Sequence, residues 1–526
     1  MPKVLVSDKV AAEGIEILKK VAEVDVKTGL TEDELCAIIG DYDALVIRSS
    51  TQVTAKVLEA AKKLKIIGRA GVGVDNVDVP VATEKGIIVV NSPGGNTIAA
   101  AELTVAMLLA LARNIPQAYH SMLGKAWDRS KFVGNEVYKK TLGILGLGKI
   151  GQEVAKRMQA FGMTVIAYDP FINAQAAEQI GVELVELDEC LRRSDYITLH
   201  LPKNKDTIGM LGAKQFAMMK DGVRIINVAR GGIIDDAALI EALKSGKCAG
   251  AALDVYVTEP PDFSSELFSL PNVVTTPHLG ASTEEAQTNV AIDVAEQIVD
   301  VFEGRSARSA VNMPALSPEV LAAVQPYLPL AERMASLAAQ TTEGRPSQIE
   351  VRYCGEIAEI DTGPIGRAVL VGLLKPVLGE TVNPVNAPVI AKQRGIEVVE
   401  SKSPDGGDYA SLLTISVKTD KGVNEISGTL FGAREMRVVR MGGFPIDIAP
   451  EGIMLVSPHT DKPGIIGQVG TILGNENINI ASMHLGRKTP GKNALMVLSV
   501  DSEVPAPVLE KLAQISGIES VKQVRL

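Results

Sequence analysis

A glycine-rich turn between an apolar strand and a helix is the first feature with chemical meaning. Gly146, Gly148 and Gly151 form a G-x-G-x-x-G pattern, and Asp169 ends the next apolar run. These glycines allow a tight turn, a close backbone approach to a pyrophosphate and close helix–strand packing, while the helix directs its first amides at phosphate oxygens. Because Asp169 can accept hydrogen bonds from ribose hydroxyls and would repel a 2′-phosphate, the pattern predicts NAD rather than NADP.

Three side chains further along the chain suit acid–base chemistry on a carboxylic acid. His278 lies on a loop after a strand, Glu259 in a TEPP turn, and Arg230 after the strand RIINVA. Histidine exchanges protons near neutral pH, a neighbouring carboxylate would orient its ring and stabilise the imidazolium, and a guanidinium fits a carboxylate together with a carbonyl oxygen. A satisfied surface histidine, a solvated loop acid and a helix-capping arginine are the ordinary alternatives. The positions after strand ends favour catalysis.

Two arginines and an asparagine in the first part of the chain predict where an anionic substrate binds. Arg48 and Arg69 follow the ends of strands, where open α/β sheets place ligands, although a solvated arginine is an equally good interpretation of either one alone. Together with Asn96 and Arg129 they would form a basic pocket for a phosphorylated acid. A neighbouring subunit could supply Arg129.

The segments around these residues resemble a known family. The catalytic segments are NVARGGIIDDAAL (227–239), LDVYVTEPP (253–261) and TTPHLGAST (275–283). The upstream segments are VIRSST (46–51), GRAGVGVDNVD (68–78) and NSPGGNTIAAAELT (91–104). They resemble the D-2-hydroxyacid dehydrogenases, in which an Arg, a Glu and a His meet in one site. Together with its C-terminal architecture, the whole chain is similar to the long-form D-3-phosphoglycerate dehydrogenase family.

The resemblance implies a reaction and a set of residue roles. The implied reaction is NAD-dependent oxidation of 3-phosphoglycerate to 3-phosphohydroxypyruvate, the first step of the phosphorylated route to L-serine. His278 would act as general base beside Glu259, and Arg230 would bind the substrate carboxylate. Beyond the fingerprint, the expected NAD contacts are Val72, Lys149, Ile150, His200, Leu201, Pro202, Val228, Ala229, Arg230, Asp254, His278, Gly280 and Ala281. Within that set, His200 would hold its loop against the cofactor through its backbone, and Asp254 would hold the nicotinamide carboxamide.

Two other functions remain open on these residues. A glyoxylate or hydroxypyruvate reductase of the same superfamily would use the same catalytic trio, because that trio acts on the 2-hydroxy acid end common to all substrates. The C-terminal 200 or so residues favour the phosphoglycerate enzyme, because a simple reductase needs none of them. A regulatory protein that senses NADH with a dehydrogenase fold is the second alternative, and retention of the trio argues against it.

Composition limits the class of protein and its partners. The 526 residues are too many for one core, and a net charge of −10 argues against nucleic acid or an anionic membrane as the main partner. The four cysteines form no CxxC pair, so we expect buried thiols in a reducing compartment and no metal site. The chain opens directly on a strand, KVLVSD, and its most apolar stretch, AAELTVAMLLALA, is too short to span a bilayer. These features predict a cytoplasmic protein.

The order of apolar segments predicts an α/β first half. A substrate-binding domain of flavodoxin-like type, residues 1–98 and 284–310, would receive a Rossmann-type nucleotide domain at 99–283 as an insertion. Helices at 99–115 and 283–303 would cross between the two domains. Strands of the inserted domain are expected at 142–146, 164–168, 196–200, 224–228, 249–253 and 273–275. Substrate would then bind in the interdomain cleft, where closure can exclude water.

The second half is expected to begin after a linker at 306–319. An intervening α+β domain would occupy 311–450, with a strand-like segment at 349–360, a helix at 363–378 and hairpin strands at 411–419 and 425–432. From 451 to 526 the order βαββαβ predicts a ferredoxin-like fold, and HTDKPGIIGQVGTIL resembles an ACT domain.

The ACT-like segment contains the candidate regulatory residues. His459 and Asp461 flank the HTDKPG turn, and Asn479 could complete an L-serine site shared across two paired modules. Alternatively, these residues only cap a helix while the module serves as a dimerisation sheet. We expect a homodimer or a homotetramer.

Overall fold

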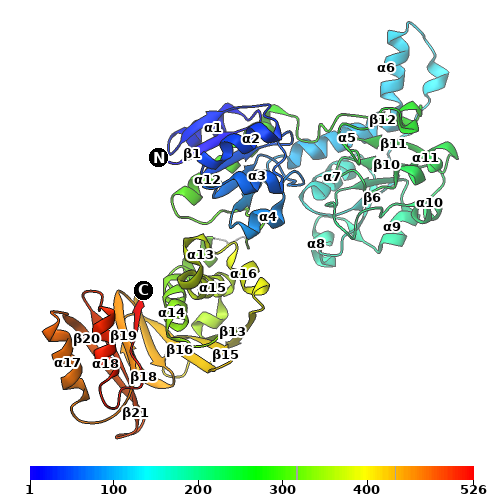
Figure 1. The fold of residues 1–526 in the computed structure, drawn as a ribbon. Helices are drawn as coiled ribbons and strands as arrows, with labels where there is room; N and C mark the ends of the chain where they lie inside the picture. The colour runs from blue at the N-terminus through cyan, green and yellow to red at the C-terminus, as the bar shows by residue number, and fades with distance from the viewer. Residues whose placement is uncertain (315–317, 433) are drawn as a thin grey trace.

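The computed structural model describes residues 1–314, 318–432 and 434–526, which form four β-sheets with their own helices (Figure 1). The linker predicted at 306–319 therefore lies partly outside the described residues. The first two sheets are parallel and the last is antiparallel. This α/β architecture agrees with the predicted fold class.

The first sheet has the strand order β2-β1-β3-β4-β5, the flavodoxin-like arrangement. Helices cover both faces, so its central strands are continuous apolar runs, as in Ala44–Ile47, where every residue is buried. The strands are β1 (Lys3–Val6), β2 (Glu23–Val26), β3 (Ala44–Ile47), β4 (Ile66–Arg69) and β5 (Ile88–Val90). The helices are α1 (Ala12–Lys19), α2 (Glu32–Ile38), α3 (Ala55–Ala60) and α4 (Val79–Glu84).

The second sheet has seven parallel strands in the order β12-β11-β10-β9-β6-β7-β8, which is the Rossmann arrangement. The strands are β6 (Thr141–Leu145), β7 (Thr164–Tyr168), β8 (Glu183–Leu184), β9 (Tyr196–Leu199), β10 (Val223–Asn227), β11 (Cys248–Leu253) and β12 (Val273–Thr275). The helices are α7 (Lys149–Ala160), α8 (Ala174–Gln179), α9 (Leu187–Arg193), α10 (Ala213–Met218) and α11 (Asp236–Lys244). The chain order reverses between β6 and β9, which is where such sheets bind dinucleotides.

Two long helices join the first two domains. Helix α5 (Thr97–Arg113) packs against α7 and β11, while α12 (Glu284–Phe302) packs against α1 and β4. Asn114 then turns the chain with φ of 52°, and α6 (Ile115–Leu123) projects as an arm away from the domain (Figure 1). No single described helix has the length and hydropathy to cross a membrane; only α5 and α6 together pass, and they are bent by 66°.

The third sheet has the order β14-β13-β15-β16-β17-β18. The strand expected at 349–360 ends at Gly355, whose φ of 78° turns the chain into a 3-10 helix at Glu356–Glu359, so the second half of that prediction was wrong. The strands are β13 (Pro346–Gly355), β14 (Glu397–Ser403), β15 (Ser411–Thr419), β16 (Gly422–Phe431), β17 (Glu435–Met441) and β18 (Phe444–Ile448). The helices are α13 (Pro318–Val324), α14 (Tyr327–Thr341), α15 (Gly363–Leu378) and α16 (Ala387–Gln393).

The last sheet has the order β20-β21-β19-β22 and the predicted βαββαβ succession. Met454 and Val497 of this sheet belong to the same apolar cluster as α14 and α15, so the last two domains share a core. The elements are β19 (Ile453–Thr460), α17 (Ile465–Asn475), β20 (Ile480–Arg487), β21 (Asn493–Val500), α18 (Ala506–Ala513) and β22 (Lys522–Arg525).

Candidate active site

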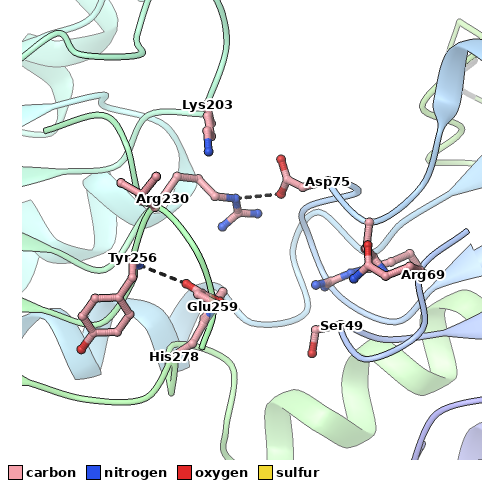
Figure 2. A pocket seen from close by; sticks show the side chains of 12 residues that line it. Ser49, Arg69, Asp75, Lys203, Arg230, Tyr256, Glu259 and His278 are labelled. Carbon is pink, nitrogen blue, oxygen red and sulfur yellow. Dashed lines mark hydrogen bonds and ion pairs between the residues drawn. The ribbon is translucent and has the colours of Figure 1, made fainter. Parts of the chain in front are cut away.

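A cavity of about 550 Å³ lies between the first two domains (Figure 2). The first domain contributes Ser49, Gln52, Arg69, Asp75 and Asn76. The second contributes Lys203, Arg230, Gly231, Tyr256, Val257, Glu259 and His278. The fold therefore brings together the three side chains predicted to be catalytic, and it places one predicted substrate arginine opposite them.

His278 and Glu259 form a close pair. Nδ1 of His278 donates to Oε2 of Glu259 at 2.6 Å, and Oε1 of Glu259 accepts from the backbone N–H of Tyr256 at 3.1 Å. This bond fixes the tautomer and leaves Nε2 as the ring nitrogen available to a substrate. The backbone of His278 has φ of 54°, a conformation held by its N–H bond to the carbonyl of Asp254 at 2.9 Å.

Arg230 follows β10 and extends into the cavity. Its own backbone is fixed by Asn227, whose amide donates to the Arg230 carbonyl at 2.9 Å and accepts from the N–H of Ala229 at 3.0 Å. Its Nη1 donates to the Ala229 carbonyl at 2.7 Å, and its Nε donates to Asp75 at 3.0 Å. The guanidinium is thus positioned where a carboxylate could bind.

Arg69 is the strongest candidate for binding an anion. Its Nε is buried without a hydrogen-bond partner, and burial followed by repulsion from Arg230 and Arg48 lowers the pKa of Arg69 to about 10. An anion placed beside this group would relieve both the missing bond and the repulsion. Arg48 stands close enough to repel it, although Arg48 is not among the residues that line the cavity.

Asn96 and Arg129, the other two predicted substrate residues, occupy different places. Asn96 precedes the first turn of α5, and its Oδ1 is buried without a partner, as is the hydroxyl of nearby Ser92. Arg129 begins a 3-10 helix in the projecting arm and does not line the cavity of its own chain. The structure thus separates Arg129 from the predicted pocket within one chain.

The glycine turn fits a dinucleotide. Gly146 has φ of 97°, and a Cβ there would lie 2.6 Å from the carbonyl of His200, whereas a Cβ at Gly151 would collide with the carbonyl of Gly146. A Cβ at Gly148 would meet nothing within 4 Å, so this side of the turn is open. The first helical amides, from Lys149, Ile150 and Gly151, face that opening because α7 begins at Lys149.

Asp169 at the end of β7 also supports the turn directly. Its Oδ2 accepts from the N–H of Leu147 at 2.8 Å, and its Oδ1 accepts from the N–H of Phe171 at 2.8 Å. Each oxygen keeps a further lone pair for a ribose hydroxyl. The carboxylate can therefore link the glycine turn to the ribose.

His200 and Asp254 are held inside the protein. Burial lowers the pKa of His200 to about 4, so the ring is neutral, and its Nε2 lies 3.1 Å from the hydroxyl of Thr198. Asp254 is fully buried, and its carboxylate accepts from Thr276 at 2.6 Å, Leu279 at 2.7 Å and Gly280 at 2.9 Å. This arrangement favours a role for Asp254 in holding the His278 loop in place, rather than the expected role of contacting the nicotinamide carboxamide.

The remaining predicted cofactor residues lie on loops after strands of the second sheet, except for Val72, which belongs to the first domain. A Cβ at Gly280 would be 3.4 Å from Val228, and one at Gly146 would be 3.0 Å from Leu201. Pro202, Ala229 and Ala281 adjoin them in sequence at the same strand ends, whereas Val72 lies on the loop after β4 in the first domain.

Several residues that line the cavity were not predicted from the sequence. Lys203 and Tyr256 belong to loops after β9 and β11, and Asp75 and Ser49 belong to loops of the first domain. Asp75 stands inside the GVGVDN segment, so its motif was visible, but only the structure shows that it meets Arg230 across the cleft.

The predicted regulatory residues do not form one cluster. His459 is buried in β19, and Asp461 accepts from the N–H of Gly491 at 3.1 Å and from Arg487 at 3.3 Å. These bonds lower the pKa of Asp461, the backbone bond from Gly491 most of all. Asn479 donates to Asp501 at 2.7 Å, at the other end of β20 and β21. Within one chain, Asp461 and Asn479 cannot share a small ligand.

The cysteines and acidic residues show no metal cluster in the part of the chain that the structure describes. Cys190 and Cys248 are buried and free, and burial raises the pKa of their thiols to about 12 and about 11. Such thiols are poor nucleophiles and poor ligands at neutral pH.

Three family descriptions match successive parts of the chain. Residues 105–280 match the NAD binding domain of D-isomer specific 2-hydroxyacid dehydrogenases, residues 323–442 the D-3-phosphoglycerate dehydrogenase intervening domain, and residues 459–517 the ACT domain.

Similar proteins and structures agree with these matches. The D-3-phosphoglycerate dehydrogenases of Synechocystis and Archaeoglobus fulgidus are 50% and 47% identical to this chain over its full length, covering 95% and 100% of their own lengths. A glyoxylate reductase structure from Paecilomyes thermophila is 31% identical, with a TM-score of 0.55, over 59% of this chain and 98% of that one. This chain therefore belongs to the D-3-phosphoglycerate dehydrogenase family.

Proposed function

We propose that this protein oxidises 3-phospho-D-glycerate at C2 to 3-phosphohydroxypyruvate with NAD as the cofactor, as the first step of a route to L-serine. The observation that carries the proposal is the cavity in which the His278–Glu259 pair and Arg230 face Arg69, whose buried Nε has no hydrogen-bond partner. One side holds the groups for a 2-hydroxy acid, and the other holds a cation for a second anionic group.

Each residue has a chemical role in this proposal. Nε2 of His278 takes the hydroxyl proton, and Glu259 stabilises the resulting imidazolium. Arg230 binds the carboxylate and stabilises the oxygen as it becomes a carbonyl. The glycine turn and Asp169 would hold NAD, which when bound would supply the acceptor for the hydride that leaves C2. Closure of the two domains around the cavity would strengthen these interactions by excluding water.

The phosphate end of the substrate is assigned to Arg69, supported by Arg48 and Asn96. We assign Arg129 to the site of a partner chain, because its arm projects from the domain and presents exposed apolar side chains. These include Tyr119, Leu123, Trp127 and Val133. An arm of this kind needs a second copy to cover it, which favours a homodimer or a homotetramer. We also propose a cytoplasmic location and feedback by L-serine at paired ACT domains.

A glyoxylate or hydroxypyruvate reductase is the second candidate, because a glyoxylate reductase shares the fold of the first half of the chain. Assays of NADH oxidation with phosphohydroxypyruvate, hydroxypyruvate, glyoxylate and 2-oxoglutarate, run side by side, separate the two. The proposal expects kcat/KM for phosphohydroxypyruvate to exceed that for hydroxypyruvate by about 10²-fold or more, the contribution of one or two charged hydrogen bonds. Equal values would favour the reductase.

A further inference from the structure

The cavity contains one acidic side chain that the proposed reaction does not use. Asp75 lies on the loop after β4 in the first domain, and its Oδ2 accepts a hydrogen bond from Nε of Arg230 at 3.0 Å. Arg230 belongs to the second domain, so the ion pair crosses the cleft (Figure 2). The pair therefore lies within the cavity that we assign to the substrate.

The pair interferes with carboxylate binding at Arg230. A guanidinium offers two edges to a carboxylate, Nε with Nη2 and Nη1 with Nη2. Asp75 engages Nε, and the Ala229 carbonyl engages Nη1, so each edge of Arg230 has one position taken. Asp75 is the partner that can leave, because its side chain is 63% exposed, whereas the carbonyl of Ala229 adjoins Arg230 in the backbone.

The loop that carries Asp75 is shaped around two arginines. A side chain at Gly73 would collide with Nη2 of Arg230, and one at Gly71 would collide with Nη1 of Arg69. The carboxylate of Asp75 attracts both guanidiniums, which repel one another, and it therefore offsets part of that repulsion when no anionic ligand is bound.

We infer that Asp75 is a resident counter-anion of the substrate site, which holds Arg230 across the cleft until an anionic ligand replaces it. The inference rests on the proposed function only in taking that ligand to be a 2-hydroxy or 2-oxo acid. Asp75 is a positioning residue, since it acts through Arg230. An exposed ion pair adds little to stability, so its loss changes ligand binding rather than folding.

The test is removal of the charge with little change in shape. Asp75→Asn is expected to lower KM for phosphohydroxypyruvate, and the Kd of oxalate and of inorganic phosphate on the NADH complex, by about 3- to 10-fold, with a smaller change in kcat. Asp75→Glu restores the wild-type values. Asp78→Asn is the matched control, because Asp78 lies on the same loop but caps α4 and does not line the cavity.

The result that overturns the inference is an unchanged or raised Kd for both anions in Asp75→Asn, or an equal fall in Asp78→Asn, which would show an effect of net charge alone. Calorimetry with oxalate and phosphate does not depend on which 2-oxo acid the enzyme reduces. If the wild type does not reduce phosphohydroxypyruvate, but oxalate binds Asp75→Asn with a lower Kd than it binds the wild type, the proposed function is wrong and the inference about Asp75 is supported.

Discussion

The nucleotide-binding domain and the ACT domain are both small sheets with helices, yet they distribute polar side chains in opposite ways. All strands of the first run parallel, so their carboxyl ends meet at one edge, where Gly146, Arg230 and His278 gather. Strands of the second are antiparallel, so Asp461 and Asn479 lie at opposite ends of the sheet. Apart from the assigned Arg129, one chain supplies the catalytic cavity, whereas a site using both ACT residues requires two chains.

The largest effect is expected at His278, in the parallel domain. His278→Ala removes the proposed general base and is expected to lower kcat by about 10²- to 10⁴-fold. The affinity for NADH, followed by its fluorescence, is expected to change little, because the glycine turn and Asp169 are intact. His484→Ala in the ACT domain serves as the control and leaves kcat within about twofold. Near-normal turnover of His278→Ala would exclude its assigned role.

A second effect is expected at Asp169, where we propose that the same edge of the sheet binds the ribose of NAD. Asp169→Asn weakens the charged hydrogen bonds to the ribose and to the N–H of Leu147, so the Kd of NAD is expected to rise by about 10- to 100-fold. Discrimination against NADP is expected to relax at the same time. Asp188→Asn, an exposed residue in the first turn of α9, makes the same charge change away from the turn. An equal loss of NAD affinity in both variants would show that the effect comes from the net charge of the protein and not from Asp169 itself.

The ring of His200 predicts that the stability of the nucleotide-binding domain depends on pH. Burial lowers its pKa to about 4, from an ordinary value of 6.5, so the unfolded chain binds this proton first as the pH falls. Stability is therefore full above about pH 6.5 and is lost progressively toward pH 4, with about 2 kcal/mol gone by pH 5. Urea unfolding followed by hydrogen exchange at β6 and β9 measures this loss. His200→Gln is expected to lack it, and an equal loss in that variant would assign the effect to other groups.

The smallest of these effects is expected at the ACT domain. If two modules pair, millimolar L-serine slows the wild-type reaction by about 5-fold or more, a coupling at the lower end of the usual range. Asn479→Ala is expected to abolish the response, and Asn475→Ala, exposed at the end of α17, to keep it. If L-serine does not slow the wild-type reaction, the role of the ACT domain is oligomerisation or the binding of another ligand.

The contrast between the two domains also explains what the sequence could predict. The apolar runs and glycines of the second sheet predicted its strands within one residue, except β8, which has only two residues and no usable pattern. The left-handed turn at Asn114, where the arm begins, had no glycine to mark it.

Residues on opposite sides of the cleft were hardest to predict. The meeting of Asp75 and Arg230 depends on how two domains pack, which local pattern does not encode. Asp254 follows β11 as expected, but its burial against the loop of Leu279 and Gly280 depends on tertiary packing.

The central claim is that the first domain binds the phosphate and the second transforms the 2-hydroxy acid. It is tested most directly by kcat/KM for phosphohydroxypyruvate relative to hydroxypyruvate, in the wild type and in Arg69→Gln. If Arg69 binds the phosphate, the ratio is expected to fall by about 10-fold or more in the variant, while kcat/KM for hydroxypyruvate changes little. An unchanged ratio, or an equal loss with both substrates, would contradict the account.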